Sequence, residues 1–191
     1  MTCSRLLLAT VVFFGCLSSS AQQSQPPTVN GKPLYEQDVL PVVESSLGQM
    51  WDSADVVVEL SIISNETRGF GPTPFVNTVH TSRALRVLKG SLKSGSSIVF
   101  AEAAGQLELP DKIIRAGDHE ALAAGNRYVV FLRWWKPFDL WTGDRFHAFK
   151  LNDGHVEPQG YGSVADAHRD LSEGRFFNEL DRIARTSRPK V

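Results

Sequence analysis

Cysteine is nearly absent from this chain of 191 residues. The two cysteines, Cys3 and Cys16, both lie near the N-terminus. The sequence beyond them therefore excludes disulfides within the chain, thiol catalysis and thiolate metal sites. Small exported domains often depend on disulfides, so this domain has to be stabilised by its hydrophobic core.

An excess of charge is also lacking. The 20 Lys and Arg residues nearly balance 21 Asp and Glu residues, which gives a net charge of −1. This balance offers no electrostatic basis for binding nucleic acid or an anionic membrane surface. The glycine-rich phosphate-binding motifs are missing, and Ser163 follows two glycines instead of standing between them as in a nucleophile elbow. The sequence therefore shows no catalytic constellation, favours a protein that is not an enzyme, and predicts no cofactor.

The N-terminus reads as an export signal. Arg5 precedes an apolar run over 6–17, which is too short to span a bilayer comfortably, and small residues lead to Ala21. We expect residues 1–21 to be this signal, and the protein to be secreted to the periplasm or outside the cell. An alternative is that 13–16 resembles a bacterial lipobox. Cys16 would then carry a lipid anchor, which is the one membrane attachment that the sequence suggests.

The remaining sequence predicts a linker and one domain. Residues 22–33 are polar with two prolines, which indicates a flexible linker, and 34–191 form the domain. Helical spacing predicts an early helix over 42–51 and a late amphipathic helix after Ser172. A short helical turn is expected at 119–123. Runs of β-branched and aromatic residues predict strands over 54–63, 76–88, 97–101, 112–115, 127–135, 145–151 and 155–157.

This order indicates a mainly β fold. We expect a small antiparallel OB-like barrel of five to six strands, with an N-terminal and a C-terminal helix packed on it. Such barrels usually bind ligands with the first hairpin and the connection between the fourth and fifth strands. In this chain those segments are 64–74 and 136–144.

Three short motifs carry a resemblance to a known family. They are Ala54-Asp55 at the first strand, 87–90 closing on Lys-Gly, and 125–131 with Gly-x-x-Tyr before an apolar strand. In their order they resemble the netrin-like module of tissue inhibitors of metalloproteinases and exported bacterial domains of that type. The resemblance implies the barrel. The inhibitors chelate the protease zinc through an N-terminal cysteine, so protease inhibition is a weaker alternative here and no functional residue is transferred.

Aromatic residues supply the candidate binding site. Alternate residues of 127–135 should point to opposite faces, with Tyr128 and Trp134 on one face and Phe131 and Trp135 on the other. At least one of these tryptophans is expected in the core. Phe138 and Trp141 in the later connection, and Phe70 in the first hairpin, are the candidate ligand-binding residues. They form either a ligand platform or a cap folded over the core.

Histidines suggest a second hypothesis. His147 and His155 flank the last predicted hairpin, with carboxylates nearby in the sequence, and are weak candidates for a metal site. Their spacing matches no metal motif, so solvated or hydrogen-bonded histidines are the alternative. We expect an exported, non-catalytic binding or interaction module for a protein, peptide or glycan. The alternative function is a metal-dependent hydrolase that uses these histidines and carboxylates.

Overall fold

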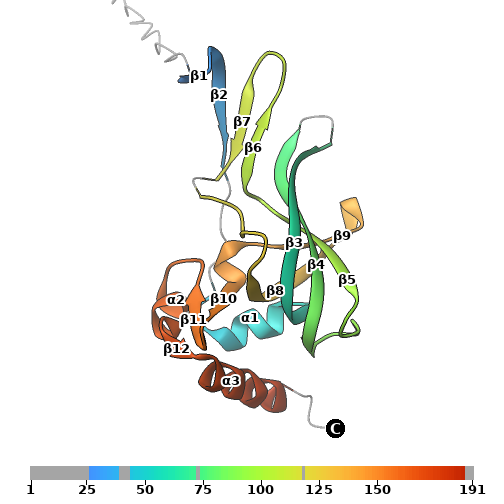
Figure 1. Cartoon of the computed structure of the whole chain (residues 1–191), viewed down its shortest axis with the longest axis vertical. Coiled ribbons are helices and arrows are strands. Elements are labelled where there is room, and N and C mark those ends of the chain that lie inside the picture. The colour runs from blue at the N-terminus through green and yellow to red at the C-terminus, as the bar shows by residue number, and fades with distance from the viewer. Residues whose placement is uncertain (1–25, 39–43, 72–73, 118, 188–191) are drawn as a thin grey trace, which may run out of the picture.

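The computed structural model describes residues 26–38, 44–71, 74–117 and 119–187. The expected export signal with Cys16, and residues 42–43 of the expected early helix, lie outside the described residues. The described chain is mainly β, with one large sheet, one small sheet and three α-helices (Figure 1). None of the described helices is long and apolar enough to cross a membrane.

The large sheet has eight strands in the order β12-β11-β10-β8-β3-β4-β5-β9. All of its pairs are antiparallel except β5 with β9, and β9 also pairs with β8. The succession of pairs β8-β3-β4-β5-β9 therefore returns to β8. The strands are β3 Val56–Phe70, β4 Phe75–Lys89, β5 Ser97–Glu102, β8 Arg127–Trp135, β9 Leu140–Gly143, β10 Ala148–Asn152, β11 His155–Pro158 and β12 Leu171–Ser172.

The first hairpin differs from the expectation. Residues 64–70, predicted to be connection, continue β3 beside β4. Polar side chains occupy this extension because they bond across the pair: Asn65 Oδ1 lies 2.8 Å from His80 Nδ1, and the hydroxyls of Thr67 and Thr78 are 3.3 Å apart. Composition alone favoured a loop here, and cross-strand pairing overrides it.

The small sheet lies at the end of the molecule where the β3–β4 hairpin turns (Figure 1). Its strands are β1 Thr28–Val29, β2 Lys32–Gln37, β6 Gly105–Glu108 and β7 Ile113–Ala116, in the order β1-β2-β7-β6. Residues 28–29 and 32–33 of the expected flexible linker are thus in strands. The reason is a distant partner, since β2 pairs in parallel with β7 and buries Leu34.

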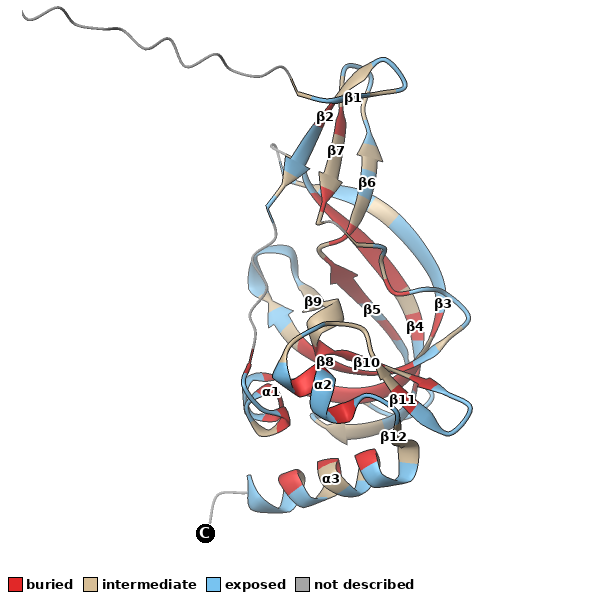
Figure 2. Cartoon of the chain, turned by 90° about the vertical axis from the view of Figure 1, so that its left-hand side faces the viewer, coloured by how far each residue is buried: buried red, intermediate tan, exposed pale blue. Residues whose placement is uncertain are grey.

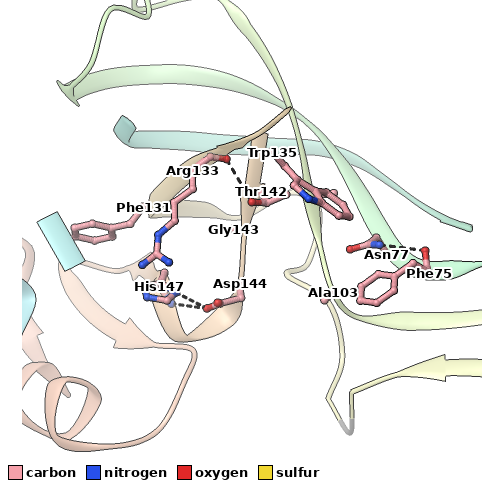
Figure 3. A pocket seen from close by; sticks show the side chains of 11 residues that line it. Phe75, Asn77, Ala103, Phe131, Arg133, Trp135, Thr142, Gly143, Asp144 and His147 are labelled. Atoms are coloured by element: carbon pink, nitrogen blue, oxygen red, sulfur yellow. Dashed lines mark hydrogen bonds and ion pairs between the residues drawn. The ribbon is translucent and has the colours of Figure 1, made fainter. Parts of the chain in front are cut away.

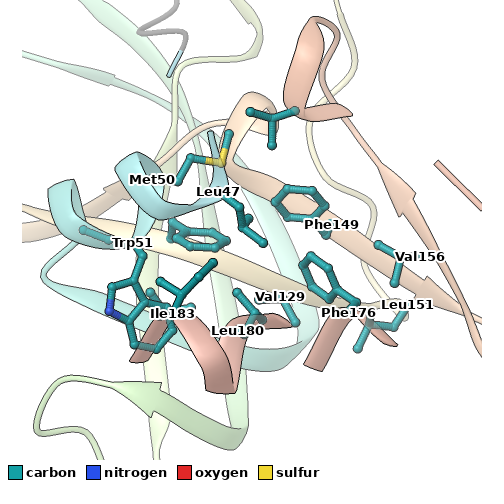
Figure 4. Close-up of a cluster of buried hydrophobic side chains, with 14 residues drawn as sticks. Leu47, Met50, Trp51, Val129, Phe149, Leu151, Val156, Phe176, Leu180 and Ile183 are labelled. Carbon is teal, nitrogen blue, oxygen red and sulfur yellow. The ribbon is translucent and has the colours of Figure 1, made fainter. Parts of the chain in front are cut away.

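Two hydrophobic clusters occupy opposite faces of β8. The first lies between the sheet and the helices α1 Leu47–Ser53 and α3 Glu173–Thr186, and Phe176 and Leu180 are wholly buried in it (Figure 4). The second contains the residues of β8 that point the other way. Figure 2 shows buried residues, in red, along β8 and the strands and helices around it. The predicted alternation is confirmed, with Val129 and Phe131 in the first cluster and Tyr128, Val130 and Leu132 in the second.

Local hydrogen bonds set where the helices begin. The predicted cap of the late helix is confirmed, because Ser172 Oγ accepts from the Arg175 amide at 3.4 Å. Helix α2 spans Ser163–His168. The helical turn expected at 119–123 is wrong, since all five residues lie outside any helix. The strand expected from 145 is also shortened: Arg145–His147 form a 3-10 turn, η2, because Asp144 caps the His147 amide at 3.1 Å.

Candidate functional site

Four aromatic rings from two distant segments form a continuous aromatic cluster. Phe70 packs against Phe138 with ring centroids 5.4 Å apart, Phe138 packs against Trp135 at 4.4 Å, and Trp135 packs against Phe75 at 6.4 Å. Phe70 and Phe75 pair at the turn end of the β3–β4 hairpin. The two segments in which the sequence predicted ligand contacts are therefore side by side.

The connection after β8 is short and shaped by its backbone. Lys136–Phe138 form one 3-10 turn, η1, with Pro137 in its first turn. Asp139 ends that turn in a left-handed conformation with φ of 52°, which Asp tolerates better than most residues. The chain then returns as β9. This reversal lays the ring of Phe138 back on Trp135, the last residue of β8.

The tryptophans divide between two environments. Trp141 lies outside the aromatic cluster: it contacts Trp134 at 4.8 Å and packs on the second hydrophobic cluster. The expectation that Trp134 or Trp135 belongs to the core is wrong. Trp134 is 39% exposed and Trp135 is half-buried, because both follow Leu132, the last β8 residue that pairs with β3. The buried tryptophan is Trp51, on α1.

A cavity of about 260 Å³ opens beside the aromatic cluster. Trp135 and Phe75 belong to both, and Figure 3 shows them with Asn77 on one side of the cavity. Arg133 and His147 lie on the opposite side, and the segment 142–144 of β9 and its end runs between the two sides (Figure 3). One wall thus combines two aromatic rings with the amide of Asn77, and the other is charged.

A charged network holds the polar wall in place. The carboxylate of Glu44 accepts hydrogen bonds from Arg133 and from Ser53, the latter at 3.0 Å, and bonds His147 Nε2. His147 Nδ1 lies 2.7 Å from Asp144 Oδ1. Both ring nitrogens of His147 thus face carboxylate oxygens, which accept but do not donate when ionised. This geometry favours the imidazolium form, with a proton on each nitrogen.

The electrostatics agree with that assignment. Burial lowers the pKa of His147, but hydrogen bonds and charge attraction from Asp144 and Glu44 outweigh it, so the pKa is raised above its usual value. Burial raises the pKa of Glu44, but the hydrogen bonds and the charge of His147, together with the Ser53 bond, leave it below its usual value. Both charged forms are therefore stabilised by the same contacts.

The structure does not bring together the two histidines of the metal hypothesis. His155 pairs with Asn152 on β10, five residues beyond His147, which corresponds to about 17 Å along a strand. Its Nδ1 lies 3.5 Å from the Asp170 carbonyl. Among the described residues, no group of three or more His, Cys, Asp and Glu side chains could hold a metal ion.

Two polar groups were not found from the sequence. Glu44 lies 103 positions from its partner His147, and no motif marks it. A second cluster joins His80 Nε2 to Glu102 at 3.0 Å, and both residues are wholly buried. Glu102 also accepts the Leu122 amide at 2.8 Å. These contacts tie β4 and β5 to the segment before β8 and give that pair a structural role.

Comparisons of the chain with protein-family models, curated proteins and solved structures find no match.

Proposed function

We propose that this protein is an exported, non-catalytic binding module built on an OB-like barrel of the netrin type. The cycle of pairs β8-β3-β4-β5-β9 supports the barrel, because a five-stranded barrel needs each strand to have two neighbours. The order of three consecutive strands, then a longer connection, then two more strands also agrees with that architecture. The resemblance of the three short motifs to netrin-like modules points the same way.

The aromatic cluster is the observation that carries the binding function. Phe75 is 43% exposed and Phe138 is 37% exposed. Exposed aromatic side chains that line a concave site are typical of ligand-binding surfaces. Phe70 ends β3 at the turn of the first hairpin and Phe138 lies in the connection after β8, and OB-like barrels usually bind ligands at these two places. Trp141, the third predicted binding residue, lies outside this cluster, against Trp134 and the second hydrophobic cluster.

The contacts of His147 argue against its use as a general base. A general base needs a nitrogen or oxygen that is free to take a proton from a substrate. Both nitrogens of His147 are already bonded to Asp144 and Glu44. Arg133 is likewise held by Glu44 and Ser53. These groups fix one another and leave a rigid surface for recognition.

Export is proposed from the apolar N-terminal sequence and its small residues before Gln22. The partner would be a protein, peptide or glycan met in the periplasm or outside the cell. Mass spectrometry of the protein purified from its host distinguishes two fates: cleavage before Gln22 gives a free protein, and a lipidated Cys16 gives a tethered one. An intact Met1 would contradict export.

The binding function is tested by truncating two rings of the aromatic cluster. We expect Phe138→Ala and Phe70→Ala to weaken binding of ligands found on glycan and peptide arrays, while thermal unfolding stays nearly unchanged. Leu85→Ala is the matched control, because Leu85 is 40% exposed on β4 outside the cluster. A ligand whose affinity is the same for Phe138→Ala, Phe70→Ala and the control would show that binding occurs elsewhere.

A further inference from the structure

We infer that the cavity between Trp135 and Arg133 binds one uncharged sugar ring of a glycan. This inference rests on the proposed binding function and names its ligand class. It uses the cavity itself, whereas the proposed function depends on the rings of Phe70 and Phe138, which do not line that cavity.

The first reason is the aromatic wall. Trp135 and Phe75 line the cavity with their rings 6.4 Å apart and inclined at 63°. The C–H face of a sugar ring is apolar and flat, so it packs against an aromatic face and removes apolar area from water. A single ring fits the volume of about 260 Å³, which is below the range of about 300–1,000 Å³ for drug-sized ligands.

The second reason is the set of unused acceptors. Asn77 is 3% exposed, and its amide nitrogen donates to the Phe75 carbonyl at 3.1 Å. Within the described parts of the chain, nothing donates to its Oδ1. Asp144 bonds His147 through Oδ1, and its Oδ2 likewise bonds no described residue. The Thr142 hydroxyl donates to the Arg133 carbonyl at 3.3 Å, which leaves its oxygen free to accept.

Donors face the same space. Arg133 uses Nη2 for both Glu44 and Ser53. Its Nε and Nη1 donate to none of the described residues, so part of a planar donor group remains for a ligand. Each hydroxyl of a sugar donates one hydrogen bond and accepts others. A mixed set of donors and acceptors suits such groups, whereas an anion needs donors and a cation needs acceptors.

Charge balance favours an uncharged ring. The polar wall combines Arg133 and the imidazolium of His147 with the carboxylates of Glu44 and Asp144. Two positive and two negative groups that neutralise one another leave little net field for a charged ligand.

A peptide strand is a poorer fit to this position. Peptides are often bound by adding a strand to an open sheet edge. Thr142 on β9 already pairs with Ala101 on one side and Arg133 on the other. The strand that lines the cavity therefore has no open edge for a peptide backbone.

The test is to titrate the protein with neutral oligosaccharides and to measure binding by calorimetry and by tryptophan fluorescence. The probes are hexamers of α-linked glucose, β-linked glucose, N-acetylglucosamine and galactose. Oligogalacturonate is the charged comparison. We expect at least one neutral hexamer to bind more tightly than oligogalacturonate. Trp135→Ala should weaken that binding by about tenfold or more, and Thr142→Val by about fivefold, the effect of one hydrogen bond.

Matched controls lie on the same strands or in similar positions. Trp134→Ala removes the neighbouring tryptophan, which lies outside the lining of the cavity. Thr81→Val removes a hydroxyl on β4 that also lies outside the lining. Both should leave affinity within about twofold, since neither change removes a contact with the ligand. Circular dichroism of each variant confirms that its fold is intact.

The outcomes separate the two proposals. If peptides bind in a manner sensitive to Phe138→Ala and no neutral sugar binds, the sugar assignment is wrong and the binding function stands. If a sugar binds but responds only to Phe138→Ala, the ligand lies on the aromatic cluster and the cavity assignment is wrong. Tighter binding of oligogalacturonate contradicts the uncharged ring. Failure of every glycan and peptide to bind overturns both proposals.

Discussion

Replacing Glu44 with Gln should destabilise the fold in a pH-dependent way. Glu44 is 9% exposed and accepts from Arg133, Ser53 and His147. Hydrogen bonds to charged groups contribute about 1.5–3 kcal/mol. The Arg133 side chain is 37% exposed, so solvent screening reduces its share to below about 1 kcal/mol. The contact with the buried His147 dominates, and we expect a loss of about 2 kcal/mol near pH 6.

The direction of the pH dependence follows from the two pKa shifts. The raised pKa of His147 contributes stability below its unfolded pKa of about 6.5, and this is lost as pH rises through the folded pKa. The lowered pKa of Glu44 contributes stability above its unfolded pKa of about 4.3, and this is lost as pH falls through the folded value. The contact between Glu44 and His147 therefore stabilises the fold most between about pH 4.5 and 6.5.

The effect of Glu44→Gln on stability is measured by urea unfolding of the unaltered protein and the variant at pH 5.5 and pH 8.5. Tryptophan fluorescence reports the unfolding. The difference in free energy of unfolding should be larger at pH 5.5, equivalent to about 4–8 °C in Tm for a chain of this size. Glu157→Gln is the control, because Glu157 pairs with Lys150 at 3.8 Å at an exposed position, and it should change stability by less than about 0.5 kcal/mol. Equal losses for Glu44→Gln at both pH values would refute the assignment of an imidazolium at His147.

Three further changes test the packing. Phe176→Ala should cost about 3–5 kcal/mol in urea unfolding, because the ring is wholly buried; Phe138→Ala, at 37% exposure, should cost clearly less, and similar losses would contradict the distinction between core and surface rings. Gly105→Ala should lower Tm by several degrees, since Gly105 has φ of 100° and an added Cβ would lie 2.7 Å from Thr78 Oγ1; an unchanged Tm would show that β6 can move. Ser172→Ala should cost about 1 kcal/mol by the same assay through loss of the helix cap, whereas no loss would mean that packing alone sets the start of α3.

Local patterns in the sequence predicted the fold best. The strand over 127–135 matches β8 residue for residue, because alternating apolar residues bury both of its faces. The cap at Ser172 was also predictable from local sequence, because it depends on residues only three positions apart. The strands β1, β2 and β6 were not predicted, because their sequences are short and polar and their partners lie far along the chain.

The candidate site was predicted in part. Phe70 and Phe138 were identified as residues of connections, but whether the two connections meet was not predicted, and only the structure shows their contact. Their neighbour Trp135 was assigned to a strand and Phe75 to no element, and only the three-dimensional arrangement shows that strand ends contribute to the cluster. Glu44 could not be found, because a single carboxylate before a helix carries no signal until His147 and Arg133 are placed beside it.

The double pairing of β9 also affects how copies of the protein meet in solution. Open strand edges invite pairing between molecules, which leads to aggregation. The strands β3, β4, β5, β8 and β9 each have neighbours on both sides. The terminal strands of the two sheets are short: β1 and β12 have two residues each, and β6 has four. This arrangement offers other molecules little open backbone to join, so the fold resists edge-to-edge aggregation.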